Sequence, residues 1–108
     1  YNNKAAAVRS YADHYRVIML QETRGNEYYL NDARHMFDGK RVFASFFRDQ
    51  LAGGVLIAID DDILGSGTVS TIIDEGRCLG VVTWHDNVEF VYINLHVEPN
   101  LSNTKRII

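Results

Sequence analysis

The sequence is poor in cysteine and proline, and it has no long hydrophobic run. Its single cysteine, Cys78, cannot form an internal disulfide, and its place in an apolar segment predicts a small core residue. No stretch is long enough to cross a bilayer, and none has the form of a secretory signal. We therefore expect an intracellular protein, nuclear or cytoplasmic, without membrane partners.

Negative charge is in only slight excess over positive charge. The formal net charge is −3, which argues against nonspecific adhesion to polyanions. A nuclease is still compatible with this balance, because it needs positive potential over its site and a bound cation supplies part of it. Net charge alone therefore does not decide whether the chain acts on nucleic acid.

The chain has the size of one small domain. Its 108 residues, 46% of them hydrophobic, are typical of a globular domain that buries roughly two-thirds of its unfolded surface. There is no initiator methionine, and the sequence ends at Ile108 inside an amphipathic stretch. We expect residues 1–108 to be part of a longer protein.

Hydrophobic periodicity predicts helices followed by strands. Apolar residues recur at helical spacing over residues 5–15, and residues 27–36 form a second, shorter helical pattern. Tyr1 and Asn2 have the pattern of a strand end. Extended patterns predict strands over 17–20, 42–47, 54–59, 69–73, 78–84 and 88–95, with 42–47 and 54–59 as hairpin partners across a polar segment at 48–50.

The connections carry turn-forming residues. We interpret Asp60, Asp61 and Asp62 as a solvated turn rather than a metal site, because consecutive carboxylates at a strand end splay apart. Residues 85–87 are predicted to form a tight turn. Gly65, Gly67 and Gly76 are predicted to occupy positive-φ positions in other connections.

The predicted fold class is α/β in the broad sense, more exactly an α+β layer with helix on one face of a sheet. The segment 54–59, GVLIAI, has no polar face, so both of its sides need cover. Helix covers only one side. A further layer, such as a second sheet supplied by sequence outside these residues, is therefore predicted on the other.

One acidic residue follows the first apolar strand directly. Glu22 stands in the run MLQET, where a strand expected to be buried on both faces ends in solvent. Ligands collect at the carboxyl ends of such strands in open α/β sheets, so Glu22 is a candidate metal ligand. The alternative is a solvated acid that closes a strand.

Several short motifs in order resemble those of the endonuclease/exonuclease/phosphatase superfamily. They are Tyr1 and Asn2, MLQET at 19–23, AGGVLIAI at 52–59, EGR at 75–77 and INLHVEPN at 93–100. This superfamily includes deoxyribonuclease I, abasic-site endonucleases, inositol polyphosphate phosphatases and endonucleases of non-LTR retrotransposons. The resemblance implies that residues 1–108 form the amino-terminal half of a four-layer α/β/β/α sandwich, the carboxy-terminal half being absent.

The resemblance also implies roles for four residues. Glu22 matches the metal-ligand glutamate, with Mg²⁺ as the expected ion and Mn²⁺ as the alternative; Mg²⁺ is often held by one or two carboxylates plus phosphate. Asn2 matches a catalytic asparagine that places the scissile phosphate. His96 matches a catalytic acid or hydrogen-bond donor. Arg77 matches a phosphate-binding arginine, suited to bidentate contact.

Two of these residues have ordinary structural alternatives. His96 at a strand end is compatible with a structural or merely exposed histidine. Arg77 is equally compatible with an ion pair to Glu75 or Asp74. Both alternatives stay open on the sequence alone.

The implied function is metal-dependent phosphodiester hydrolysis, with a DNA endonuclease of retrotransposon type as the leading hypothesis and DNA as the substrate. The later GDxN and SDH motifs of the superfamily, which position water and phosphate, have no counterpart in these residues. We therefore expect the chain to be inactive in isolation. The alternatives are a noncatalytic remnant of such a domain and a phosphatase acting on inositol phosphates.

Overall fold

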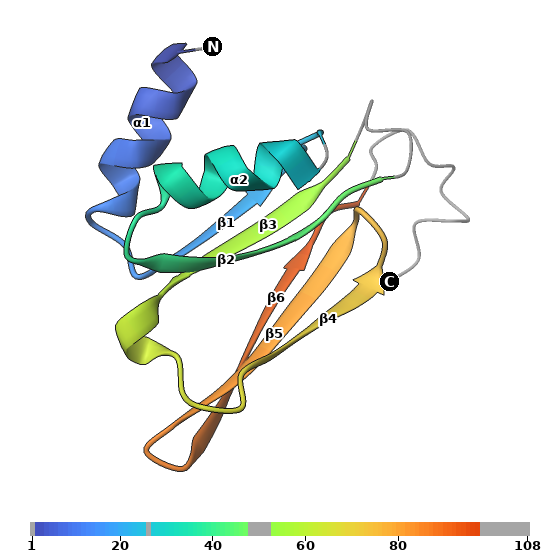
Figure 1. Cartoon of the computed structure of the whole chain (residues 1–108). Coiled ribbons are helices and arrows are strands. Elements are labelled where there is room, and N and C mark those ends of the chain that lie inside the picture. The colour runs from blue at the N-terminus through green and yellow to red at the C-terminus, as the bar shows by residue number, and fades with distance from the viewer. Residues whose placement is uncertain (1, 26, 48–52, 98–108) are drawn as a thin grey trace.

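The computed structural model describes residues 2–25, 27–47 and 53–97, and in this part the chain forms three layers. Two antiparallel sheets of three strands each, ordered β1-β3-β2 and β4-β5-β6, are stacked, and both helices lie on the far side of the first sheet (Figure 1). The elements are α1 (Asn2–Ala12), β1 (Val17–Gln21), α2 (Glu27–Met36), β2 (Lys40–Ser45), β3 (Val55–Asp60), a 3₁₀ turn (Asp61–Ile63), β4 (Val69–Asp74), β5 (Cys78–His85) and β6 (Val88–Leu95).

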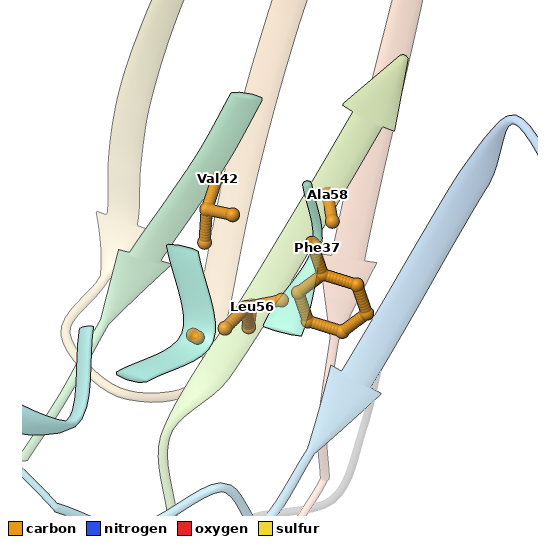
Figure 2. Close-up of a cluster of buried hydrophobic side chains, with 5 residues drawn as sticks. Phe37, Val42, Leu56 and Ala58 are labelled. Carbon is orange, nitrogen blue, oxygen red and sulfur yellow. The ribbon is translucent and has the colours of Figure 1, made fainter. Parts of the chain in front are cut away.

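Strand β3 is the centre of the fold because its side chains belong to two hydrophobic cores, one on each face of the first sheet. Leu56 and Ala58 point toward the helices and pack with Phe37 and Val42 (Figure 2). The alternate residues, represented by Ile57, pack with buried side chains of β5 in the second sheet. Successive side chains of a strand point to opposite faces, so an uninterrupted apolar strand is buried on both sides only between two layers.

The predicted second layer is present, but its source differs from the expectation. The covering sheet comes from residues 69–95 of this chain and not from sequence outside it. Inward-facing Leu79 and Val81 of β5 supply the apolar surface. The α+β class is confirmed, and the described residues form three layers rather than four.

Strand β1 is less buried than its apolar sequence predicts. It pairs only with β3, in antiparallel register from Val17 opposite Ile59 to Gln21 opposite Val55, and so forms one edge of the first sheet. Met19 is 39% exposed as a result. The expectation that residues 17–20 are covered on both faces is therefore wrong, because pattern alone does not distinguish an edge strand from a central one.

Helix α1 begins and ends about three residues earlier than its apolar spacing predicts. Residue 2 is helical, so the expected strand end at Asn2 is wrong, while Tyr1 lies outside the described residues. Val8 and Ala12 pack on the core, whereas Tyr11 and Tyr15 are exposed, with ring centroids 6.2 Å apart. Lys40 Nζ donates to the Ala12 carbonyl at 2.9 Å, which satisfies one of the unpaired carbonyls at the helix end.

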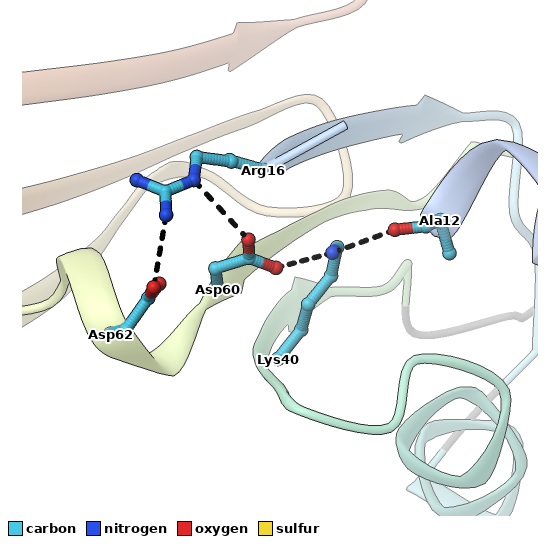
Figure 3. Close-up of polar contacts among 5 residues, drawn as sticks. All are labelled: Ala12, Arg16, Lys40, Asp60 and Asp62. Carbon is cyan, nitrogen blue, oxygen red and sulfur yellow. Dashed lines mark hydrogen bonds and ion pairs between the residues drawn. The ribbon is translucent and has the colours of Figure 1, made fainter. Parts of the chain in front are cut away.

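The acidic triplet after β3 has two different environments. Asp62 is exposed and pairs with Arg16 at 3.0 Å, in agreement with a solvated turn. Asp60 instead accepts from Lys40, whose side chain is only 5% exposed, and lies 3.8 Å from Arg16 Nε (Figure 3). The solvated interpretation is wrong for Asp60, because this carboxylate compensates a buried ammonium group.

The predicted hairpins are confirmed. β2 pairs with β3, and β5 with β6 through a two-residue turn in which Asp86 and Asn87 both have positive φ. Gly67 and Gly76 also have positive φ, as predicted. Gly65 does not; a Cβ there would lie 2.0 Å from the Trp84 carbonyl oxygen, so close backbone approach requires glycine. The polar segment predicted at 48–50 lies outside the described residues.

The outer face of the second sheet carries apolar side chains in contact with solvent. In register across the three strands, this face exposes Val69, Trp84, Val91, Ile93 and Leu95. Cys78 is buried, as predicted. None of the helices in the described part of the chain has the length and apolar character needed to span a membrane.

Candidate functional site

The ends of two strands that lie far apart in the sequence meet at one end of the sandwich. Glu22 follows β1 of the first sheet, and His96 follows β6 of the second. His96 Nε2 lies 2.9 Å from Glu22 Oε1, with side chains 16% and 39% exposed respectively. The stacking of the two sheets thus brings together the two residues that the sequence singled out as metal ligand and catalytic histidine.

An amide network beneath this pair joins the two sheets. Asn94, 2% exposed, donates through Nδ2 to the carbonyls of Leu20 at 2.9 Å and Leu56 at 3.0 Å. Gln21 donates through Nε2 to the Leu95 carbonyl at 2.7 Å and to Asn94 Oδ1 at 3.2 Å. Its remaining oxygen, Oε1, lies 3.3 Å from His96 Nδ1. Both ring nitrogens of His96 therefore face a side chain from the end of β1.

The backbone at Glu22 is in a conformation that L-residues rarely adopt. Glu22 has φ of 57° and Arg24 has φ of 52°, and both lie in the left-handed region. The other two non-glycine residues of this kind in the described chain, Asp86 and Asn87, are explained by their hairpin turn. Such strain persists only where surrounding contacts determine it, and it is found preferentially at functional sites.

Substitutions at Glu22 are expected to show this strain directly. Glu22→Gly should be more stable than Glu22→Ala by about 1 kcal/mol, because glycine has no Cβ penalty at positive φ. The same two substitutions at Glu89, near the start of β6, should show the opposite order by about 0.5–1 kcal/mol. Urea unfolding followed by circular dichroism measures both differences. Equal stability of the two Glu22 variants would contradict the left-handed assignment.

Among the described residues the Arg77 side chain does not pair with the neighbouring acids, although its backbone N–H donates to the Asp74 carbonyl at 2.9 Å. The His96 amide donates to the Arg77 carbonyl at 2.8 Å. The guanidinium lies over the Phe47 ring, 5.0 Å from its centroid. Within residues 2–25, 27–47 and 53–97, Arg77 forms no ion pair with Asp74 or Glu75, and its Nε is buried without an acceptor.

A cationic side chain also lies beside the Glu22 carboxylate. Arg24 Nε lies 3.8 Å from Glu22 Oε2, the oxygen other than the one in contact with His96 Nε2. The loop that carries both residues is held by backbone bonds from Thr23 to the Gly54 carbonyl and from Arg24 to the Gly53 carbonyl. Both glycines have positive φ, and in this conformation their carbonyls accept the hydrogen bonds that hold the Glu22 loop.

The remaining predicted site residue, Asn2, is the first residue of α1, and its side chain lies outside the described part of the structure. Its assignment to phosphate binding stays a prediction. Gln21, Asn94 and Arg24 were not predicted as site residues. A polar residue in the apolar run of β6 was the available signal for Asn94, whereas nothing in the sequence pointed to Arg24.

The donors at this site fit one mode of metal binding. No group of three or more histidine, cysteine or acidic side chains in the described chain is arranged to hold a metal ion, so an all-protein cage is not formed there. Glu22 supplies a single half-exposed carboxylate. Mg²⁺ is commonly bound in this way, by one or two carboxylates with water and substrate phosphate completing the shell.

Comparisons with protein-family models, with curated proteins and with solved structures find no match for this chain.

Proposed function

We propose that the chain forms the Glu22-bearing half of a metal-dependent phosphodiester hydrolase site of the endonuclease/exonuclease/phosphatase type, with DNA as its substrate. The observation that carries this proposal is the 2.9 Å contact between Glu22 and His96. Their pairing requires two sheets to stack in one register, and the resemblance singles out the same two residues. The left-handed backbone at Glu22 adds independent support.

Each side chain has a distinct task in the proposed site. Glu22 holds the divalent cation through a carboxylate oxygen, and the cation, when bound, polarises a phosphoryl oxygen and offsets developing charge. His96 presents Nε2 on the same side as that carboxylate and donates a hydrogen bond or proton to an oxygen of the phosphodiester. Arg77, which is partly exposed, would bind a non-bridging phosphate oxygen through its guanidinium.

Paramagnetic broadening by Mn²⁺ tests the metal site in the 108-residue chain. Mn²⁺ added well below stoichiometry should broaden the NMR signals of Glu22 and His96 first, because relaxation falls steeply with distance from the bound ion. Glu22→Gln should abolish this broadening. Glu89→Gln, which removes the same charge from an exposed position of β6, should leave it unchanged.

The acidic turn after β3 provides an internal comparison. Asp61 and Asp62 are exposed carboxylates close together in the sequence, and they belong to the opposite end of β3 from Val55, which pairs with Gln21. Broadening centred on Asp61 and Asp62, with Glu22 and His96 unaffected, would overturn the proposed site. Broadening of both regions that Glu22→Gln removes only at Glu22 would support it.

A further inference from the structure

We infer that Gln21 is a positioning residue that selects the Nδ1-protonated tautomer of His96 and thereby makes Nε2 the nitrogen that acts at the site. The structural part of this inference stands on hydrogen-bond geometry alone. Its meaning for hydrolysis rests on the proposed function.

The orientation of the Asn94 amide follows from its partners. Leu20 and Leu56 present backbone carbonyls, which accept hydrogen bonds only, so the Asn94 atom that faces them is the NH₂ group. Asn94 Oδ1 therefore points toward Gln21. Because Asn94 is 2% exposed, water does not offer this amide an alternative set of partners.

The same reasoning orients Gln21. Its Nε2 lies 2.7 Å from the Leu95 carbonyl and 3.2 Å from Asn94 Oδ1, and both of these atoms are acceptors. The Gln21 atom that faces His96 is consequently the carbonyl oxygen Oε1, at 3.3 Å from Nδ1. An amide oxygen cannot donate, so this contact is favourable only when His96 Nδ1 carries a proton.

Glu22 contacts the other ring nitrogen of His96, Nε2, and favours a proton there. Its carboxylate accepts from Nε2, and a charged acceptor forms the stronger hydrogen bond. Once this carboxylate is occupied elsewhere, Gln21 is the group among the described residues that still discriminates between the two ring nitrogens. Gln21 then keeps a proton on Nδ1, so Nε2 is the nitrogen that gains and loses a proton at the site: it donates in the protonated ring and carries a lone pair in the neutral one.

Long-range ¹H–¹⁵N NMR of the 108-residue chain tests this inference, because it shows which ring nitrogen carries the proton. In Glu22→Met, which leaves no carboxylate or amide opposite Nε2, and at about pH 9 where an ordinary histidine is neutral, His96 should be mainly the Nδ1–H tautomer. Adding Gln21→Met, which keeps the length of the side chain without its amide, should shift His96 to the Nε2–H tautomer that free histidine prefers. An Nε2–H ring in Glu22→Met alone, or an unchanged spectrum in the double variant, would overturn the inference.

Other histidines of the chain serve as internal controls. His14 Nδ1 faces the Ser10 carbonyl at 2.9 Å, so His14 provides a reference for the Nδ1–H signal. His14 and His85 should be unchanged in every variant. If Gln21→Met prevents folding, the Glu22→Met spectrum by itself still decides the outcome. No metal or substrate is added, so this result is independent of the Mn²⁺ experiment on the proposed function.

Discussion

Glu22→Gln is expected to lower Mg²⁺-dependent nicking of supercoiled plasmid by roughly two orders of magnitude or more in an extended protein that joins residues 1–108 to a carboxy-terminal half carrying the GDxN and SDH motifs. The amide keeps the size of the side chain but removes the carboxylate that Glu22 offers to a hard cation at this end of β1. The contact with His96 also loses its charge, because a neutral amide replaces the carboxylate acceptor. Gel electrophoresis of plasmid topoisomers measures the loss.

Two comparisons make this result specific. Glu89→Gln removes the same charge from β6 in the same extended protein and should retain nearly full activity. The 108-residue chain alone should not nick plasmid, because the GDxN and SDH motifs that would place water and phosphate are not in its sequence. Full activity of the Glu22 variant would contradict the proposed function, and cleavage by the 108-residue chain would contradict the expectation that it is inactive in isolation.

Asn94→Asp is expected to destabilise the chain by about 3–5 kcal/mol, a large part of the stability of a small domain. The amide at this position donates to two backbone carbonyls, one on β1 and one on β3. Aspartate would set a carboxylate oxygen against those carbonyl oxygens at a site only 2% exposed. Both an ionised carboxylate and a neutral one whose oxygen lacks a donor lower the stability at such a buried position.

The same substitution at an exposed asparagine is the matched control. Asn31→Asp on the solvent side of α2 changes the same atoms and should alter the free energy of unfolding by less than about 0.5 kcal/mol. Urea unfolding of the two variants gives the comparison. If Asn94→Asp were as mild as Asn31→Asp, the assignment of Asn94 as the polar link between the sheets would be wrong.

The elements predicted best were those whose signals lie within one short stretch of the sequence. The helix at 27–36 and the strand at 88–95 have the predicted bounds, because each has its own hydrophobic period and flanking turn residues. The burial of β3 on both faces followed from GVLIAI, since a strand without a polar face needs a packing layer on each side. The edge position of β1 and the role of Asp60 were missed, because both depend on which elements become neighbours.

The sequence by itself determined the α+β class and the need to bury both faces of β3, because local period and residue type express these properties. It also singled out Glu22 by its place after an apolar strand, and His96 through the resemblance of its motif to that of a known superfamily. Tertiary structure alone decided that residues 69–95 cover β3, that Glu22 adopts a left-handed backbone, and that Gln21 and Asn94 connect it to His96. These features arise from the register of one sheet against another. No local pattern encodes that register, because it is set by side chains that meet only after the chain has folded.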